Sequence, residues 1–449
     1  MKVRISACVI VKNEEKNLPR WLAQMARLAD EMIVVDTGSQ DRTVGLAEAA
    51  GAKVYRFAWR NDFAAAKNYA LDQAAGDWVF FLDADEYFEE GTEPRVRPYL
   101  EQVHLQWKIA GLISPWINID PERQNLVVLS GHQVRIFRNE KELRYVGRIH
   151  EALDNRGKQK GMREYRMTDL VIRHTGYTIG NSERKAKRNL EILLEDVERN
   201  GGERPEQYTY FVDCYLGLRD YEKTVHYAKL AIENEGAGGQ FGQLRPNYCR
   251  MFDALHCGKY PQERMMEELQ ECIRLHPLWP EPFWYMGRLC LVQKCYLQAE
   301  EALRRMLMLA EQQKSDPEIY LQNSEADWML PYAYAMLGEI EALSGRRQEA
   351  VRHLTACLRA ETQNSRYLQL LCRLLQSEPE TERIQLLQSL CGRAQDRALL
   401  LQVLGGFPWD GVYAFFANSA DGSYVAAMAR GQYREAARLA AEDLQSGMR

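Results

Sequence analysis

The sequence predicts two kinds of fold in one chain: an α/β domain at the N-terminus, followed by an all-α array of helical repeats. In the first part, strand and helix patterns alternate, which is typical of a parallel sheet with helical crossovers. In the later part, pairs of helices joined by glycine-containing turns recur, which is typical of a solenoid. We expect the α/β domain over residues 1–180, a linker helix over 181–205 and the helical repeats over 206–449.

Length and composition agree with a soluble protein of two or three domains. The chain has 449 residues and a formal net charge of -5, so no global basic excess points to nucleic acid. No apolar run approaches the roughly 18 residues that a membrane span needs. The first strand meets Lys12 too early for a signal peptide. We therefore predict a cytoplasmic location with no membrane span and no nucleic-acid partner.

The ten cysteines do not form a recognisable framework. None occurs in a CxxC pair, most lie inside helical patterns, and no zinc spacing is present. The pattern favours buried thiols in a reducing compartment.

One acidic motif carries most of the functional information. The apolar run at residues 78–82 begins after Gly76 and ends at Asp83-Ala84-Asp85, so it is typical of a strand buried on both faces. In an open parallel sheet, ligands bind beyond the carboxyl ends of the strands. Paired carboxylates there suit a hard divalent cation that is shared with substrate phosphates. The motif predicts an enzyme that handles a nucleotide diphosphate.

Polar residues also follow the other strands of this region. Glu14 lies just after the strand that ends near Val11, and Asp36 and Asp62 follow the next two strands. Any one of these residues alone could simply be a helix cap. Together with the acidic motif, however, they would gather at one edge of the sheet, and this predicts a site.

Three segments carry a resemblance to a known family. They are residues 8–15 (CVIVKNEE), residues 33–43 (IVVDTGSQDRT), and residues 66–70 (AKNYA) leading into FLDAD at 81–85. Jointly they resemble the family 2 glycosyltransferases, which have the nucleotide-sugar-binding GT-A fold. The resemblance covers roughly residues 3 to 180.

The resemblance implies a UDP-sugar donor and a divalent cation, Mn²⁺ or Mg²⁺. In such enzymes, residues matching Asp36 pair with the uracil ring, those matching Glu14 and Asp83 touch the ribose, and the one matching Lys67 lies near the diphosphate. The residue matching Asp85 binds the metal. The donor-binding residues that we expect are Val11, Glu14, Asp36, Asp62, Lys67, Asp83 and Ala84.

The second half of the α/β domain would supply the catalytic base and a further metal ligand. Inverting transfer needs a base for the acceptor and a Lewis acid for the departing diphosphate. Glu151 resembles the acidic residue that such enzymes use as the base, and His174 resembles a further metal ligand. His150 could do either job. An isolated His–Glu pair is also common as a surface salt link or a polar core network.

The helical half resembles tetratricopeptide repeats. The matches are Tyr208 to Ala231, Phe283 to Ala302 and Tyr334 to Ala350, with degenerate units near residues 258–260 and 431–436. The basic cluster at residues 184–188 opens a long helix and is either a solvated face or a phosphate contact. The aromatic segment at 404–416 has no repeat assignment and is either a cap or a contact surface.

The combination resembles a bacterial group of peptide S-glycosyltransferases. It implies transfer of a hexose to a Cys, Ser or Thr side chain of a peptide or protein, with the helices supporting a homodimer and acceptor placement. Two alternatives stay open. One is a transferase that acts on a cell-envelope or capsular glycan, and the other is a non-catalytic repeat scaffold with a vestigial sugar-nucleotide domain.

Overall fold

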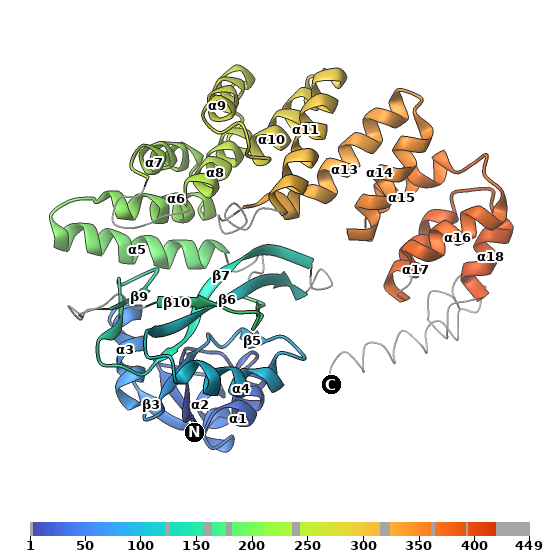
Figure 1. The fold of residues 1–449 in the computed structure, drawn as a ribbon. Coiled ribbons are helices and arrows are strands. Elements are labelled where there is room, and N and C mark those ends of the chain that lie inside the picture. Colours follow the sequence, from blue (N-terminus) through green and yellow to red (C-terminus); the bar gives the residue numbers. More distant parts are fainter. Residues whose placement is uncertain are drawn as a thin grey trace. The chain divides into compact units, whose positions relative to one another are not determined.

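The computed structural model describes most of the chain as two compact units. The described residues are 3–121, 126–155, 164–176, 182–235, 243–314, 324–360, 364–391 and 394–418. The first unit comprises Met1–Glu267 with Gln313–Glu325, and the second comprises Glu268–Gln312 with Ala326–Arg449. Figure 1 shows the strands and helices coloured along the sequence.

A mixed β-sheet forms the centre of the first unit. Strand β1 (Ile5–Val11) lies between β2 (Glu31–Asp36) and β4 (Trp78–Phe81) and is parallel to both. Strand β3 (Lys53–Arg56) extends the parallel part beyond β2. On the other side of β4 the order continues with β7 (Leu126–Arg138), β6 (Ile109–Asp120), β11 (Ile172–His174) and β5 (Glu86–Phe88), while β10 (Glu164–Met167) pairs with β6.

Antiparallel pairing begins where the chain returns to the sheet. Strand β7 runs antiparallel to both β4 and β6, and β5 runs antiparallel to β11. A separate hairpin is formed by β8 (Leu143–Val146) and β9 (Ala152–Asn155). The order β3-β2-β1-β4-β7 and the acidic loop after β4 define the GT-A class of fold. The predicted strands of the N-terminal third are confirmed, whereas the short strand β5 was not predicted.

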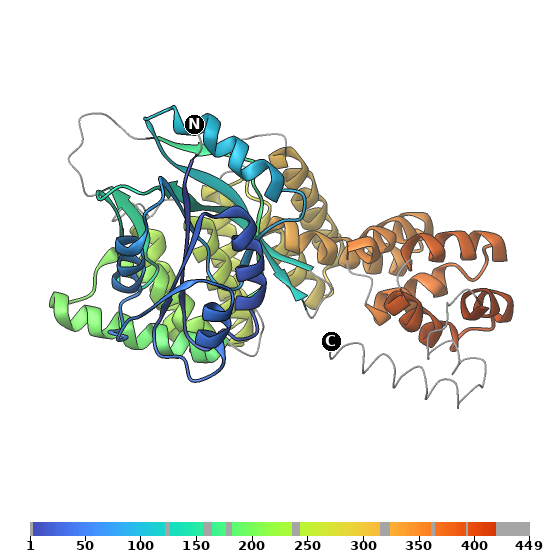
Figure 2. The same cartoon turned by 90° about the horizontal axis from the view of Figure 1, so that it is seen from below.

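Helices cover both faces of the sheet because its strands are apolar on both sides. They are α1 (Leu18–Leu28), α2 (Thr43–Ala49), α3 (Phe63–Gln73) and α4 (Glu93–His104). Helices α1 and α4 pack on one face with Val9 of β1, and α3 packs on the other face with Cys8. Figure 2 shows the sheet between these two layers.

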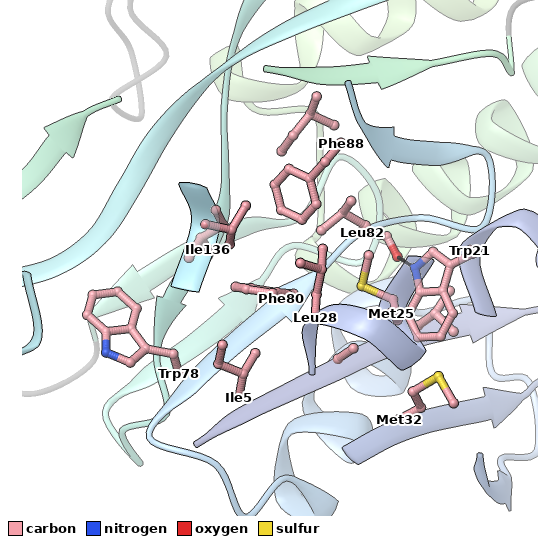
Figure 3. Close-up of a cluster of buried hydrophobic side chains, with 14 of the residues drawn as sticks. Ile5, Trp21, Met25, Leu28, Met32, Trp78, Phe80, Leu82, Phe88 and Ile136 are labelled. Atoms are coloured by element: carbon pink, nitrogen blue, oxygen red, sulfur yellow. Dashed lines mark hydrogen bonds between the residues drawn. The ribbon is translucent and has the colours of Figure 1, made fainter. Parts of the chain in front are cut away.

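The core on the α1 face is built from large side chains at helical spacing. Trp21, Met25 and Leu28 of α1 are buried against Phe80 of β4, as Figure 3 shows. The Trp21 indole Nε1 donates a hydrogen bond of 3.2 Å to the Leu82 carbonyl oxygen, so this buried polar atom has a partner. The bond ties α1 to the start of the acidic loop that follows β4.

The first unit also contains the first helices of the α-helical half. They are α5 (Ser182–Asn200), η3 (Pro205–Gln207), α6 (Tyr208–Gly217), α7 (Tyr221–Glu233) and α8 (Leu244–Cys257). Leu193 of α5 and Phe211 of α6 share a buried apolar cluster with Ile149 from the α/β domain. Packing therefore divides the chain near residue 267, whereas the kind of secondary structure changes near residue 180. The predicted boundary at 180 stays a prediction.

The second unit is an array of helix pairs of the tetratricopeptide type. Gly287 faces Leu303, and Gly338 faces Leu354, so the same contact recurs at the same spacing. A Cβ atom at either glycine would lie 2.6–2.7 Å from the leucine Cγ, so only glycine lets the paired helices approach this closely. The helices are α9 (Gln262–Leu275), which crosses the division between the units, α10 (Glu281–Val292), α11 (Tyr296–Lys314), α13 (Ala326–Leu343), α14 (Arg347–Ala360), α15 (Ser365–Leu374), α16 (Glu380–Leu390), α17 (Ala394–Leu404) and α18 (Asp410–Asn418).

The aromatic segment at 404–416 belongs to the core of the second unit. Trp409 and Phe416 are buried with Val412 against α15, α16 and α17. The predicted degenerate repeat at 431–436 lies outside the described residues. Across the described ranges, no helix combines the length and the apolar character that crossing a membrane requires.

The cysteines are mostly core residues. None of the ten, all of which lie in the described part of the chain, forms a disulfide. Eight of these ten are buried, as predicted for core thiols, while Cys257 is exposed and Cys295 is partly exposed.

Candidate functional site

The carboxyl ends of β1, β2 and β4 meet at one edge of the sheet. Val11 ends β1 directly opposite Asp36, which ends β2, and β4 lies in register on the other side of β1. Val11, Asp36 and Ala84 are buried, while Asp83 is partly exposed. The strand register therefore brings these predicted residues together.

Hydrogen bonds shape the loops at this edge. The Asp36 carboxylate accepts from the Ser39 backbone N–H at 3.0 Å and from that of Gly38 at 3.2 Å. Gly38 has φ 108°, a left-handed conformation that glycine adopts without strain. Asn13 accepts from the Gln40 N–H through its side chain and donates its own N–H to the Ser39 hydroxyl. The loops after β1 and β2 therefore form one bonded layer.

Glu14 lies in this layer, and the pKa of its carboxyl group is raised above the usual value. Its carboxylate accepts a hydrogen bond of 2.9 Å from the Asn17 side chain. Burial raises the pKa of Glu14, the Asn17 hydrogen bond opposes this effect, and the negative charges of Asp85 and Asp83 raise the pKa further. The positive charge of Lys185 lowers it. Glu14 is therefore within electrostatic range of the acidic motif.

Asp62 and Lys67 lie on the first turns of α3. Asp62 is the N-cap of that helix, since its carboxylate accepts from the Ala65 N–H at 2.8 Å. This capping geometry agrees with the structural interpretation of Asp62, while its predicted donor contact stays a prediction.

Lys67 joins two carboxylates from distant parts of the chain. Its Nζ lies 2.7 Å from Glu151 Oε1 and 3.3 Å from Asp83 Oδ1, although the side chain is only 3% exposed. Burial alone would lower the pKa of Lys67, but the charges of Asp83 and Glu151 raise it above its usual value. Its ammonium also lies 5.2 Å from the ring centroids of Phe81 and Tyr145. The lysine therefore remains a buried cation between the acidic motif and the loop before β9.

Glu86 and Arg135 hold the acidic loop in place. The Asp83 N–H donates to Glu86 Oε2 at 3.0 Å, and Arg135 contacts both Glu86, at 2.7 Å, and Asp83, at 3.3 Å. Trp116 Nε1 donates to Glu86 Oε1 at 2.8 Å. Burial acts to raise the pKa of Asp83, but Lys67 and Arg135 keep it well below its usual range. Sequence reasoning missed these residues; an arginine inside the alternating pattern of β7 was the available signal.

Asp85 and His174 face each other across the pairing of β5 and β11. Asp85 Oδ2 lies 3.3 Å from His174 Nε2, and the Thr175 N–H donates to the Asp85 carbonyl at 3.0 Å. His174 Nδ1 lies 3.1 Å from Asn118 Oδ1, and its ring stacks on Trp116 with centroids 4.9 Å apart. Burial lowers the pKa of His174, but the hydrogen bond and charge of Asp85 raise it overall.

The Asp85–His174 contact is a hydrogen-bonded ion pair, and its separation would also allow both atoms to reach one cation. Two ligands at right angles on bonds of about 2.1 Å would lie about 3 Å apart, close to the observed separation. The contact from His174 Nδ1 to Asn118 is the outer-shell bond that usually directs the other imidazole nitrogen at a metal. Among the described residues, no group of three or more His, Cys, Asp or Glu side chains is arranged to hold a metal ion.

Gly176 packs directly against the Asp85–His174 pair. A Cβ atom on Gly176 would lie 2.0 Å from Asp85 Oδ2 and 2.6 Å from His174 Nε2. Any larger residue would displace the pair.

Glu151 and His150 belong to the loop between β8 and β9, but their side chains have different neighbours. Glu151 pairs with Lys67, whereas the exposed His150 ring stacks on Tyr210 of α6, with centroids 4.1 Å apart and planes within 3°. Arg148 donates to Glu195 of α5 at 2.9 Å, and its backbone carbonyl accepts from the Phe63 N–H. Helices α5 and α6 therefore support the loop that carries Glu151.

Comparison with known proteins agrees with this fold. Residues 6–106 match the family described as "Glycosyl transferase family 2". This match supports a family 2 glycosyltransferase domain over those residues, which include β1 to β5 but not β6, β7 or β11.

Two curated relatives extend the similarity along the chain. A TPR repeat-containing protein of Synechococcus elongatus is 34% identical over 218 residues, which is 47% of this chain and 50% of the relative. The SPbeta prophage-derived glycosyltransferase SunS of Bacillus subtilis is 26% identical over 239 residues, which is 51% of this chain and 53% of the relative. The chain thus spans about half the length of each of these relatives.

Solved structures show lower overall similarity. Residues 1–349 of TarS from S. aureus match with 14% identity and a TM-score of 0.33, covering 60% of this chain and 91% of that one. Glucosyl-3-phosphoglycerate synthase of Mycobacterium tuberculosis, solved with Mn²⁺, UDP and glucosyl-3-phosphoglycerate, matches with 19% identity and a TM-score of 0.31, covering 45% of this chain and 81% of that one. At such scores the fold class rests on the strand order described above.

Proposed function

We propose that this protein is an inverting hexosyltransferase that moves the sugar of a UDP-sugar to a Cys, Ser or Thr side chain of a peptide or protein. The observation that carries the proposal is the convergence of Asp36, Asp83 and the Asp85–His174 pair at the strand ends of a family 2 domain. A fold of this class binds its ligand at that edge.

The donor would occupy the edge formed by the loops after β1, β2 and β4. In this proposal Asp36 contacts the uracil, Glu14 and Asp83 contact the ribose, and Lys67 lies near the diphosphate. Val11, Ala84 and Asp62 would complete the wall of the donor-binding site. Asp85 and His174 would hold Mn²⁺ or Mg²⁺, which supplies Lewis-acid stabilisation of the departing diphosphate.

Glu151 would act as the base. The acceptor atom gives its proton to the Glu151 carboxylate and attacks the anomeric carbon, and the bond between that carbon and the diphosphate oxygen breaks. Lys67 fixes the orientation of Glu151 through the 2.7 Å ion pair. His150 is a weaker candidate because its ring stacks on Tyr210.

A peptide or protein acceptor is supported by the helical array, since stacked helix pairs present extended surfaces that bind such partners. The same array is the proposed site of a homodimer. A cytoplasmic location stays a prediction.

The test uses the full-length protein with a panel of nucleotide sugars and Mn²⁺. Nucleotide release is followed with and without peptides that contain Cys, Ser or Thr, and mass spectrometry identifies the modified side chain. We expect release from a UDP-sugar that requires both the metal and a peptide. Release that responds only to a glycan acceptor would redirect the proposal to envelope glycans, and no release from any donor would contradict it.

A matched pair of variants tests the metal assignment. Asp85→Asn should reduce metal-dependent turnover by an amount on the order of several kcal/mol in activation free energy, because it weakens the cation site. Asp72→Asn changes an exposed aspartate on α3 that pairs with Arg144 at 3.1 Å, and it should leave turnover unchanged. Equal rates for wild type and Asp85→Asn at saturating Mn²⁺ would exclude Asp85 as a ligand.

A further inference from the structure

Helix α5 places the ammonium group of Lys185 near the Asp85–His174 pair. Lys185 lies in the first turns of α5, and its Nζ donates a hydrogen bond of 3.1 Å to the Gly176 carbonyl oxygen. Gly176 in turn packs against Asp85 and His174, because a Cβ atom on Gly176 would clash with both side chains. The ammonium of Lys185 therefore contacts the residue that packs against the proposed ligand pair.

The same charge also acts electrostatically on the donor edge. The positive charge of Lys185 lowers the pKa of Glu14, the residue that also responds to Asp83 and Asp85. Lys185 thus acts on Glu14 of the loop after β1 and contacts Gly176, two residues beyond the end of β11.

The other basic residues of the cluster differ from Lys185. Arg188 lies over the Phe63 ring, 5.1 Å from its centroid, and donates to Asn189. Lys187 is exposed and is two residues further along α5, which places it about 200° around the helix from Lys185. Of these three, Lys185 is the one that hydrogen-bonds to Gly176, whereas the charge of Glu151 acts on Arg188.

We propose that Lys185 contacts the diphosphate of the donor and stabilises it as it departs. This inference rests on the proposed function. The exposed ammonium can leave the Gly176 carbonyl and donate hydrogen bonds to phosphate oxygens, which gain negative charge when the bond to the anomeric carbon breaks. Lys185 transfers no proton in this step, and UDP leaves with both electrons of the broken bond. The first helix after the family 2 domain would then contribute directly to catalysis.

The test compares Lys185→Met with Lys187→Met in the full-length protein. Calorimetry with Mn²⁺ measures the affinity for UDP and for uridine, and steady-state assays measure kcat. We expect Lys185→Met to weaken UDP binding and to lower kcat by roughly 10- to 100-fold each, as for loss of a charge-assisted hydrogen bond. Uridine affinity and the melting temperature should not change, because uridine has no phosphate.

The conservative variant and the control decide the outcome. Lys185→Arg should recover most of the UDP affinity, and Lys187→Met should behave as wild type. Unchanged UDP affinity in Lys185→Met, or an equal loss in Lys187→Met, would overturn the assignment. Failure of the wild type to bind UDP at all would instead contradict the proposed function, so the two failures can be told apart.

Discussion

The two units each contain a cluster of buried or partly buried charges, and the clusters differ in balance. In the second unit, Glu300 accepts two hydrogen bonds from Arg346 and one from Arg304, and Arg304 also contacts the fully buried Glu341. Glu341 pairs in addition with His353 at 2.6 Å. Acidic and basic groups therefore satisfy each other inside the fold.

The edge of the first unit has more acids than bases. Among its described residues, five carboxylates lie here, those of Glu14, Asp83, Asp85, Glu86 and Glu151, and they outnumber the cations Lys67, Arg135 and Lys185 even with His174 added as the partner of Asp85. Burying such an excess costs free energy unless a positive partner binds. The comparison teaches that a balanced cluster supports the fold, whereas an acidic excess at strand ends indicates a ligand site.

The largest expected effect concerns Glu151. Glu151→Gln keeps the shape of the side chain but removes the proton acceptor, so acceptor-dependent transfer should fall by roughly 10²–10⁴-fold while UDP-sugar affinity barely changes. Initial rates and donor titrations measure both quantities. Asp154→Asn, an exposed acid three residues further along, is the control. A loss of donor affinity instead would place Glu151 among the donor or metal contacts, and a near-normal rate would move attention to His150.

A smaller effect should come from Glu195, which lies outside the acidic edge. Its carboxylate accepts hydrogen bonds from Arg148 at 2.9 Å and from Asn61 at 2.8 Å, so it fixes the loop that carries Glu151. Glu195→Ala should lower acceptor-dependent kcat by roughly 10- to 100-fold with little change in donor KM, because the base is misplaced.

The controls for Glu195 separate positioning from stability. Glu195→Gln retains one acceptor oxygen and should recover part of the rate, and the exposed Glu198→Ala should have no effect. If donor KM rises as much as kcat falls, Glu195 supports the whole domain rather than this loop.

The smallest effect tests the balanced cluster. The hydrogen bond from Arg346, opposed by burial and helped by Arg304, lowers the pKa of Glu300 to about 2. A carboxyl group whose pKa is depressed in the folded state stabilises the fold above its unfolded pKa of about 4.3, and that stability disappears as the pH falls through the folded value. Glu300→Gln should therefore lower the melting temperature at pH 7 by about 2–4 °C.

The pH dependence distinguishes this cause from a general packing defect. The difference in melting temperature between wild type and Glu300→Gln should shrink below pH 4 and vanish below pH 2. The exposed neighbour Glu301 provides the control variant, Glu301→Gln, which should melt as wild type at both pH values. A difference that persists unchanged at acid pH would show that the charge of Glu300 is not responsible.

The sequence predicted the parallel half of the sheet because its signals are local. The buried strand at residues 78–82 and the acids that follow it are adjacent in the chain, as are Val11 and Glu14. The family 2 resemblance and the GT-A fold were confirmed by the family match and by the strand order.

The support of the site could not be predicted because it depends on long-range pairing. Arg135 reaches the acidic loop, and Asn118 reaches His174, only because β6 and β7 pair with each other and with β4 and β11. Nothing near Glu86 in the sequence indicates a bond to Trp116. In the same way, the basic cluster on α5 left two interpretations open, and only the contact between Lys185 and Gly176 gives one of them a geometric argument.

The distribution of thiols gives this protein a built-in pair of labelling sites. Cys257 is exposed in the first unit, and Cys295 is partly exposed in the second. Burial raises the pKa of Cys214 and Cys372 to about 12, so these thiols react slowly with maleimides. Fluorophores attached to Cys257 and Cys295 would report the distance between the two units, with and without donor, in a chain that carries no engineered residue.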